Sequence, residues 1–560
     1  MGKLVTRELF TLLKNFGVQH VIGSPGSRNA ALLAEIDSMD DLTSHVVVDE
    51  RSAGFIALGL ALGSRTPVAL ICTSGSAVLN YAPAISEAYY QGIPLIVISA
   101  DRPYEWIDQD DSQTIRQHGV LSNFVKKSYD ILGDCKDPEY LWYVNRIVNE
   151  GMLESLNPKM GPVHFNIHLN GETDEIRRDR IHTARTVEIL KPKQLIDTTI
   201  IDTLAEEATG KKIMLVAGFH LPDNNLQKAV LSLLSLPNVC IMAETVSNLH
   251  LPNSCYQVDI PLFRLSDKEK RILAPDILIS MGGALISRQL KEFIRNNPPR
   301  AHWSLSYSDV LVDCFKSLTV KIESEPSSFI KAFSSRLARR QEGWESTYGT
   351  QWEEIRSRLT PGIARYPWCD LKALSMLLNS LPEDANLFLS NGTSVRYGQV
   401  IPYDVTHATY SNRGVSGIEG CTSTSVGLAM AYPSLTCLIT GDMSFGYDLA
   451  GLVSGSENNR LRIVVLDNNG GDIFRFIPST RNLSIREQYL SVGRELPVGL
   501  LADAFGFIYY YADTEKKLRE YIGEFFSNSP RPAILHIDTR EADNSSILTE
   551  YLTGKNNRKK

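Results

Sequence analysis

The sequence lacks the features that mark secreted, membrane-spanning or nucleic-acid-binding proteins. Its eight cysteines are scattered without a Cys-x-x-Cys pair, so neither a zinc site nor a disulfide framework is indicated, and we expect reduced thiols. No apolar run reaches the roughly 18 residues that cross a bilayer, and the first residues, MGKLVTRELF, lack the apolar stretch of a signal peptide. A net charge of -7 gives no reason to expect a polyanionic partner. We therefore expect a cytoplasmic protein that binds neither nucleic acid nor membrane.

What the sequence does have is enough apolar residues for several cores. It contains 560 residues, 43% of them hydrophobic, which indicates about three domains. Continuous apolar runs bounded by turn residues recur at 67–72, 94–99, 213–218, 277–283, 387–390, 436–440, 463–466 and 533–537. Such runs are typical of strands buried on both faces of a parallel sheet, and their alternation with helical segments predicts an α/β protein with three doubly wound domains. We predict domains over 1–185, over 186–352 with a charged helical connector near its end, and over 353–560.

Two predicted strand ends in the last third of the chain carry oxygen ligands suited to magnesium. The strand at 436–440 leads into GDM (441–443), and the strand at 463–466 leads into NNGG (468–471) after a spacer that covers 444–467. If these ends face one another, they present a carboxylate, an amide oxygen and a backbone carbonyl, which Mg²⁺ prefers beside phosphate oxygens. The small residues also let the backbone approach a diphosphate closely. Two ordinary turns are the alternative, because Gly-Asp and Asn-Gly are common turn dipeptides.

A carboxyl group in the first third stands at a predicted change from strand to helix. Val46-Val47-Val48 predicts an apolar strand, Asp49 and Glu50 follow it, and the small residues of 52–63 predict a helix. A carboxyl group largely removed from water at such a place keeps its proton available for acid–base chemistry. The alternative is that Asp49 or Glu50 caps the start of the helix, where acidic residues are favoured in any case.

These two segments resemble those of the thiamine-diphosphate enzymes. The region 441–469 is similar to the family motif of GDG, a spacer of this length and NN, with Met443 in place of the last glycine. The resemblance implies Mg²⁺, or alternatively Mn²⁺, held by Asp442, Asn469 and the Gly471 carbonyl. It implies that the cofactor also contacts Gly441, Ser444 and Ile418, the last as an apolar wedge that bends it, with ordinary core packing as the alternative for Ile418. It makes Glu50 the catalytic acid beside the aminopyrimidine ring.

Five longer segments narrow the resemblance within this group. They are SPGSRNAAL (24–32), DERSAGFIALGLA (49–61), EAYYQGIPLIVISADRP (87–103), SNRGVSGIEG (411–420) and NNGGDIF (468–474). Together they are similar to the 2-succinyl-5-enolpyruvyl-6-hydroxy-3-cyclohexene-1-carboxylate synthases of menaquinone biosynthesis. The resemblance implies a transferase that decarboxylates 2-oxoglutarate on thiamine diphosphate and adds the succinyl carbanion to isochorismate. It also implies a pyrimidine-binding first domain, a Rossmann-like central domain, a diphosphate-binding third domain, and a homodimer or homotetramer with active sites at the subunit interface.

Substrates of this kind carry four carboxylates between them, so the site needs arginines, whose planar fork matches a carboxylate. By resemblance, isochorismate is held by Ser27, Arg28, Arg102, Gln113 and Arg288. Arg396 and Arg413 face the part derived from 2-oxoglutarate, and Ile473 and Phe474 form an apolar wall. Two positions depart from the family. Ser287 stands where some members have lysine, and Gly392 stands where a serine often precedes the matching arginine.

Two other functions stay open. An enzyme similar to acetohydroxyacid synthase would use the same cofactor on pyruvate and should bind a flavin in its middle domain, where Gly282-Gly283 forms no G-x-G-x-x-G fingerprint. A non-catalytic metabolite-binding protein is expected to lack Glu50 or the pair of Asp442 and Asn469, and all three residues are present. The first domain also lacks the paired histidines of simple pyruvate decarboxylases.

Overall fold

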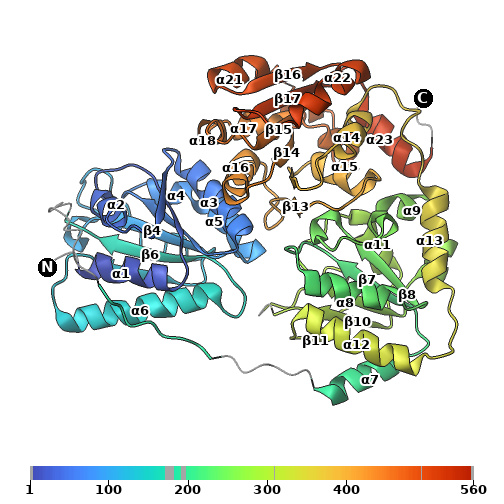
Figure 1. The fold of residues 1–560 in the computed structure, drawn as a ribbon, viewed down its shortest axis with the longest axis horizontal. Helices are drawn as coiled ribbons and strands as arrows, with labels where there is room; N and C mark the ends of the chain where they lie inside the picture. Colours follow the sequence, from blue (N-terminus) through green and yellow to red (C-terminus); the bar gives the residue numbers. More distant parts are fainter. Residues whose placement is uncertain (1–3, 171–181, 191–196, 308–309, 494, 556–560) are drawn as a thin grey trace. The chain divides into compact units, whose positions relative to one another are not determined.

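The structure is a computed structural model that describes the chain except residues 1–3, 171–181, 191–196, 308–309, 494 and 556–560, and it contains three parallel sheets (Figure 1). The strands of the first sheet lie between residues 20 and 168, those of the second between 213 and 322, and those of the third between 386 and 538. The predicted α/β fold class, with three parallel sheets that follow one another along the chain, is therefore confirmed. The domain limits at 185 and 352 stay predictions. None of the helices in the described residues has the length and apolarity that a bilayer crossing demands.

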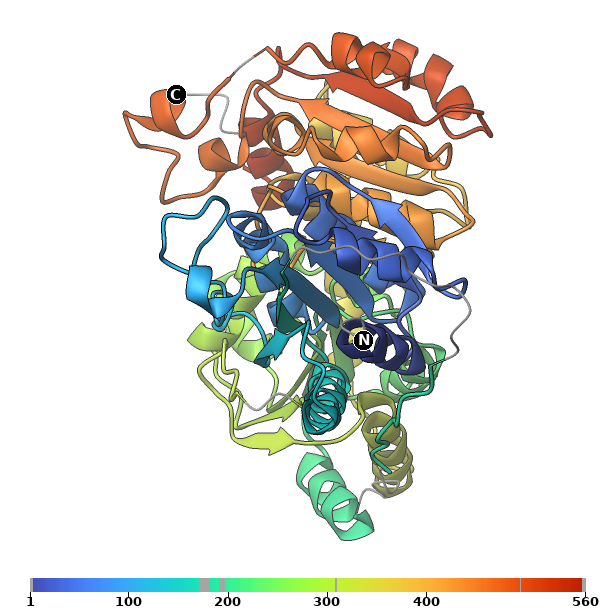
Figure 2. The ribbon, with the colours of Figure 1, turned by 90° about the vertical axis from the view of Figure 1, so that its left-hand side faces the viewer.

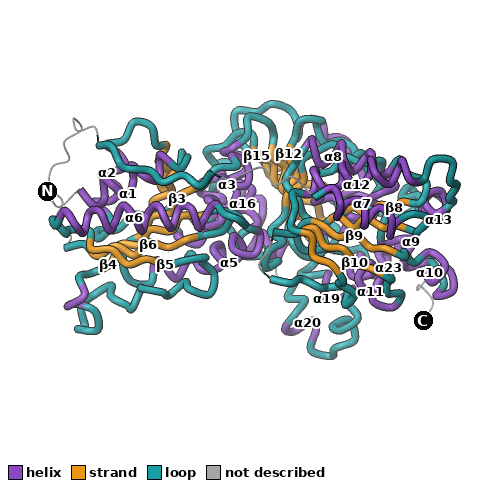
Figure 3. Tube along the Cα trace, turned by 90° about the horizontal axis from the view of Figure 1, so that it is seen from below, coloured by secondary structure: helices purple, strands orange, loops and turns teal. Residues whose placement is uncertain are grey.

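The first sheet has six strands in the order β2-β1-β3-β4-β6-β5. The strands are β1 (His20–Gly23), β2 (Thr43–Val46), β3 (Val68–Cys72), β4 (Leu95–Asp101), β5 (Ser128–Leu132) and β6 (Val163–His168). The helices are α1 (Leu4–Asn15), α2 (Ala30–Asp37), α3 (Glu50–Ser64), α4 (Ala77–Asn80), α5 (Ala82–Gln91) and α6 (Pro138–Leu156). Figure 3 shows α6 running along the strands, and it packs on β5 and β6. Because the strand order reverses between β1 and β3, ligand-binding residues are expected after these strands.

The prediction of an apolar strand at Val46–Val48 is wrong in two respects: the strand ends earlier, and two of its three valines are exposed. The strand β2 ends at Val46 and is the edge strand beside β1. Val46 is 73% exposed and Val48 is 75% exposed, whereas Val47 between them is buried. An edge strand has a neighbour on one side only, so the sheet does not force its side chains into a core.

The second sheet has five strands in the order β11-β10-β9-β7-β8. The strands are β7 (Ile213–Ala217), β8 (Val239–Ala243), β9 (Ile277–Met281), β10 (Ala301–Leu305) and β11 (Val320–Ile322). Its helices are α7 (Thr198–Ala208), α8 (Asn224–Leu234), α9 (Asp259–Arg264), α10 (Asp267–Leu273), α11 (Arg288–Asn296), α12 (Pro326–Arg340) and α13 (Tyr348–Leu359). The predicted charged connector forms α12 and α13, which bury Phe333 and Trp352. The strand order reverses between β7 and β9, and there the turns after the two strands touch. A Cβ on Gly218 would lie 2.3 Å from the Gly283 carbonyl oxygen, so backbone occupies the space between the two strand ends.

The third sheet has six strands in the order β13-β12-β14-β15-β17-β16. Figure 2 draws strands of this sheet in orange and red. The strands are β12 (Asn386–Leu389), β13 (Thr409–Tyr410), β14 (Thr436–Gly441), β15 (Leu461–Asp467), β16 (Ile508–Ala512) and β17 (Ala533–Asp538). Its helices are α14 (Asp370–Leu378), α15 (Ser394–Val400), α16 (Cys421–Ala431), α17 (Asp442–Tyr447), α18 (Gly451–Gly455), α19 (Ile473–Phe476), α20 (Arg486–Tyr489), α21 (Val498–Ala504), α22 (Glu515–Phe525) and α23 (Asn544–Thr553). The strand order reverses between β12 and β14, so ligand-binding residues are expected after these strands.

The described chain divides into two compact units that do not follow the sequence order. The first unit comprises Met1–Lys191, Asn412–Thr436 and Tyr447–Leu461, and the second comprises Pro192–Ser411, Cys437–Gly446 and Arg462–Lys560. Within the first unit, α3 and α16 lie side by side (Figure 1). A Cβ on Gly59 would lie 1.9 Å from the Thr424 oxygen, and one on Gly427 would lie 2.0 Å from the Ile56 oxygen. Glycine therefore lets the two helix backbones touch.

Candidate active site

The turn after β1 meets the turn after β3 where the strand order of the first sheet reverses. A Cβ on Gly26 would lie 2.3 Å from the Cβ of Thr73, so only glycine lets the two turns approach this closely. Ser27 and Arg28 end the first of these turns, Ser27 exposed and Arg28 half-buried. These two predicted substrate residues therefore stand where doubly wound sheets bind ligands.

Arg28 lies near a second guanidinium group, that of Arg102. Burial lowers the pKa of Arg28, the charge of Arg102 lowers it further, and the carboxylates of Asp111 and Asp101 oppose both effects. The Nη1 atom of Arg28 donates to the Leu169 carbonyl at 3.4 Å, whereas its Nε is buried without a hydrogen-bond partner among the described residues. Two neighbouring guanidinium groups with an unused N–H suit a carboxylate ligand.

Arg102 follows β4 and is fixed by the loop that contains Gln113. Its Nη1 pairs with Asp111 at 2.6 Å, and its Nη2 donates to the Ser112 carbonyl at 2.9 Å. Gln113 has a φ angle of 53°, and its backbone lies 3.2 Å from where a Cβ on Gly75 would be. The structure therefore brings the four predicted substrate residues of the first sheet to one edge, although they follow two different strands, β1 and β4.

A buried polar network, which the sequence analysis missed, lies beside these residues. The Gln117 side chain accepts a hydrogen bond from the Gly75 amide at 2.6 Å and donates one to Asn166 at 3.0 Å. Asn166 in turn donates to Asp101 and to Asp130, each at 2.8 Å. The Nε2 atom of His168 lies 3.0 Å from Oδ1 of Asp130. Burial opposes ionisation of Asp130, but hydrogen bonds from His168, Tyr104 and Asn166 lower its pKa to about 2. The network ties the backbone of Arg102 and the Gly75 turn to the sheet, since Asp101 also accepts the Arg102 amide at 2.7 Å.

Glu50 is the first residue of α3, and its neighbour Asp49 caps the helix. The Asp49 carboxylate accepts the Ser52 amide at 2.9 Å. The Glu50 carboxylate is half-exposed and lies 3.5 Å from the Asn80 side-chain nitrogen. Burial raises the pKa of Cys72 at the end of β3, and the charge of Glu50 raises it further, so the carboxylate stands close to that strand end. The capping role therefore falls on Asp49, which leaves Glu50 available for other contacts.

Arg413 and Ile418 lie on a loop of the first unit that precedes α16. Both are half-buried. The loop is anchored before Arg413 by the Asn412 side chain, which donates to Thr424 at 3.0 Å. It is anchored after Ile418 by Gly420, where a Cβ would lie 2.1 Å from the Phe55 ring of α3. The structure therefore holds this loop against the helix that begins with Glu50.

In the second unit, the two strand ends predicted to bind a metal ion do meet. Asp442 follows β14 and accepts the Gly470 amide, from the loop after β15, at 2.6 Å. Asn469, Gly470 and Gly471 have φ angles of 67°, 82° and 61°. This left-handed run turns the backbone of the loop around the Asp442 carboxylate. Asp442 and Ser444 are buried, and Asn469 is exposed.

These groups fit a hard divalent cation beside a diphosphate. Burial raises the pKa of Asp442, and in the described part of the chain no basic side chain lies within ion-pair distance of it. A Cβ on Gly441 would meet no atom within 4 Å, so the space at the end of β14 is open. Met443 lies against Gly471, where a Cβ would be 2.6 Å from its sulfur. The departure at Met443 therefore fills space beside the loop and leaves the oxygen ligands in position.

Arg288 and Arg396 line one cavity of about 270 Å³ in the second unit. A third guanidinium group, that of Arg481, lines the same cavity, and Phe476 and Ile477 contribute apolar wall. Guanidinium groups around a partly apolar wall suit a small carboxylate with a hydrocarbon body. Arg481, Phe476 and Ile477 were not predicted from the sequence, although all three lie within seven residues of the predicted wall at Ile473 and Phe474. Those two residues are half-exposed in α19, and the Phe474 ring lies against Gly471.

The two departures from the family each have a local structural reason. Ser287 caps α11, because its side chain accepts the Leu290 amide at 3.0 Å, and it also donates to Asp259. Gly392 has a φ angle of 102°, a conformation that side chains rarely adopt, and its carbonyl accepts a hydrogen bond from Arg396 at 3.1 Å. Both positions therefore help to fix the neighbouring arginines.

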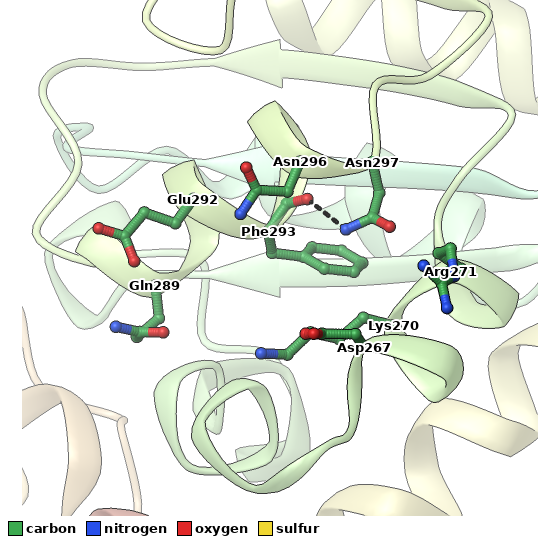
Figure 4. Close-up of a pocket in the computed structure, with 8 residues that line it drawn as sticks. All are labelled: Asp267, Lys270, Arg271, Gln289, Glu292, Phe293, Asn296 and Asn297. Atoms are coloured by element: carbon green, nitrogen blue, oxygen red, sulfur yellow. Dashed lines mark hydrogen bonds between the residues drawn. The ribbon is translucent and has the colours of Figure 1, made fainter.

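A second cavity, of about 290 Å³, lies beside α11 and is polar (Figure 4). Asp267, Lys270 and Arg271 line it from α10, and the Asn297 side chain donates to the Phe293 carbonyl at 2.9 Å. It shares Gln289 and Glu292 with the first cavity but contains none of the predicted substrate arginines.

Known proteins that resemble this chain show its family and its fold. A family model described as the thiamine pyrophosphate enzyme, N-terminal TPP binding domain, matches residues 5–120. Relatives over nearly the whole chain are 2-succinyl-5-enolpyruvyl-6-hydroxy-3-cyclohexene-1-carboxylate synthases. The protein of Porphyromonas gingivalis is 37% identical, and the match covers 97% of this chain and 96% of the relative. The protein of Christiangramia forsetii is 34% identical, and the match covers 98% of each of the two chains. The crystal structure of benzoylformate decarboxylase from Polynucleobacter necessarius has a TM-score of 0.73 at 19% identity, covering 96% of this chain and 99% of its own, and shows the fold.

The family model that matches residues 5–120 and the full-length relatives together define a thiamine-diphosphate enzyme. The chain belongs to the 2-succinyl-5-enolpyruvyl-6-hydroxy-3-cyclohexene-1-carboxylate synthase family. The prediction of a thiamine-diphosphate-dependent decarboxylating carboligase of this family is confirmed by these matches.

Proposed function

We propose that this enzyme removes carbon dioxide from 2-oxoglutarate and joins the remaining succinyl unit to isochorismate, a step of menaquinone biosynthesis. The observation that carries the choice of substrates is the placing of arginines at strand ends in both units. Arg28 and Arg102 stand together at the edge of the first sheet, and Arg288 and Arg396 line one cavity of the second unit. Guanidinium groups in both units suit two substrates that carry four carboxylates between them.

In the proposed reaction, Ser27, Gln113 and the first pair of arginines hold isochorismate together with Arg288. Arg396 and Arg413 hold the 2-oxoglutarate carboxylates, and Ile473 and Phe474 supply an apolar wall. Glu50 holds a proton on its carboxyl group for transfer to the cofactor ring. This assignment gives Arg481, Phe476 and Ile477 a supporting role as lining of the cavity with Arg396.

Asp442, Asn469 and the Gly471 carbonyl would hold Mg²⁺ or Mn²⁺, with Gly441, Ser444 and Ile418 against the cofactor. When bound, thiamine diphosphate supplies the electron sink that decarboxylation needs. The support for this site is the buried Asp442 carboxylate, which faces the left-handed loop at 469–471.

A homodimer or homotetramer is part of the proposal. Val46, Val48 and Leu79 are exposed apolar side chains close in sequence to Glu50 and to its neighbour Asn80. A second subunit over this surface would bury them and remove water from the Glu50 carboxyl. A cytoplasmic location is favoured by the eight cysteines, all of which are free thiols.

Turnover tests the proposal directly. Purified protein is incubated with 2-oxoglutarate, isochorismate, thiamine diphosphate and Mg²⁺, and carbon dioxide and the joined product are measured while each component is omitted in turn. We expect product only from the complete mixture. Product from pyruvate instead of 2-oxoglutarate would favour an enzyme similar to acetohydroxyacid synthase, and no turnover of any 2-oxo acid would reject catalysis.

A further inference from the structure

Glu87, a residue without a role in the proposed reaction, is buried against the loop that carries Arg413. It lies on α5 of the first unit and is 2% exposed. Its carboxylate accepts the backbone amides of Gly414 at 2.5 Å, Val415 at 2.6 Å and Ser416 at 3.3 Å. Hydrogen bonds to a carboxylate are about twice as strong as those between neutral groups. Three consecutive amides of one loop therefore converge on a single buried side chain.

The loop backbone also touches the helix directly. A Cβ on Gly414 would lie 2.5 Å from the Glu87 carbonyl oxygen and 3.1 Å from the Gln91 amide nitrogen. A larger residue at position 414 would therefore push the loop away from α5. The Gln91 side chain donates to the same Glu87 carboxylate, which fixes the rotamer of Glu87.

We infer that Glu87 is a positioning residue that fixes Arg413 for binding of the 2-oxo acid. Asn412 and Gly420 anchor the ends of the loop to Thr424 and to Phe55, and Glu87 holds the segment immediately after Arg413. Three amide contacts on adjacent residues leave the Arg413 backbone little freedom to rotate. A guanidinium group whose backbone is fixed loses less conformational entropy when it binds a carboxylate. The inference rests on the proposed function, because it assigns Arg413 to 2-oxoglutarate.

The experiment compares Glu87→Gln with the wild type, because glutamine keeps the size of the side chain but removes the charge and turns one acceptor into a donor. We expect the KM for 2-oxoglutarate to rise about 10-fold, the size that the loss of one charge-assisted hydrogen bond gives, while the KM for isochorismate stays unchanged. Combined with Arg413→Ala, the Glu87→Gln change should add little, because both act on one contact. Glu139→Gln, at an exposed position of α6 in the same unit, is the matched control and should leave both KM values unaltered.

Amide hydrogen exchange gives a readout that does not depend on turnover. The amides of residues 414–416 should exchange faster in Glu87→Gln and at the wild-type rate in Glu139→Gln. Gly414→Ala should reproduce the faster exchange and the raised KM through the steric route. Unchanged exchange at 414–416 in Glu87→Gln would overturn the inference, and so would faster exchange with an unaltered KM for 2-oxoglutarate. If the wild type does not consume 2-oxoglutarate, the proposed function fails, and the exchange rates still decide whether Glu87 holds the loop.

Discussion

Asp49 and Glu50 are neighbours of the same charge in different surroundings. The Asp49 carboxylate accepts a hydrogen bond from the Ser52 amide and so caps α3. Glu50 is turned toward Asn80 and the end of β3, and it makes no helix cap. Substituting each of the two residues in turn therefore separates the helix-capping role of Asp49 from the proposed catalytic role of Glu50.

Glu50→Gln should lower kcat by about 10²- to 10⁴-fold, the usual contribution of a positioned acid or base. Thiamine diphosphate and Mg²⁺ should still bind, because the change leaves the proposed metal ligands Asp442, Asn469 and Gly471 intact. Steady-state kinetics and calorimetric titration of the cofactor check the two halves of this prediction. Asp49→Asn is the control, because asparagine caps helices as well as aspartate does and activity should be kept. Turnover of Glu50→Gln near the wild-type rate would reject the role of Glu50.

Asp442→Ala should weaken cofactor binding at least about 10-fold. Mutation of a residue that only hydrogen-bonds to a metal ligand already lowers metal affinity by about that much, and Asp442 is proposed as a ligand itself. The loss should depend on Mg²⁺, so titrations with and without the metal distinguish it from a general disturbance of the fold. Asp503→Ala, at an exposed position of α21, should bind the cofactor as the wild type does. An affinity of Asp442→Ala equal to that of the wild type would count against the metal site.

At the scale of elements, the packing of α3 on α16 depends on glycine. The two helix backbones touch at Gly59 and Gly427, so the start of α3 and the loop before α16 are parts of one packed layer. Glu50 opens α3 and Ile418 precedes α16, so both are fixed by the same contact.

Gly59→Ala should therefore destabilise the protein, because its Cβ would lie 1.9 Å from the Thr424 oxygen. We expect a cost of about 1–3 kcal/mol, typical of overpacking, and a midpoint of thermal unfolding lower by several degrees. Gly523→Ala is the matched control. It lies in α22, where a Cβ would meet nothing within 4 Å, and alanine there should raise stability by about 0.5–1 kcal/mol. A melting temperature of Gly59→Ala equal to that of the wild type would contradict the packing argument.

How well each element could be predicted follows from its place in its sheet. The strands β3, β4 and β7 are buried along their whole length, and they stand out as continuous apolar runs. The edge strands β2 and β5 carry polar side chains and leave no such signal. The meeting of Asp442 with the loop at 469–471 was predictable because each follows an apolar strand and lies in a short motif. The contact of Glu87 with Gly414 spans 327 positions, and no local pattern announces such a pairing.

Both compact units of the chain contain residues that are proposed to bind the cofactor or the substrates. Glu50, Arg28 and Arg102 belong to the first unit, and Asp442 and Arg396 belong to the second. We propose that the acid and the metal ligands act on one cofactor from two different subunits. The exposed valines beside Glu50 support a partner at that surface.

Mixing two inactive variants tests this claim most directly. Glu50→Gln and Asp442→Ala are each purified as inactive protein, mixed, and allowed to exchange subunits, with exchange followed by native mass spectrometry. Random pairing makes half of the dimers mixed, and each mixed dimer then has one site with both residues intact, so we expect roughly a quarter of the wild-type activity to return. A mixture that has exchanged its subunits and stays as inactive as either variant alone would contradict the account.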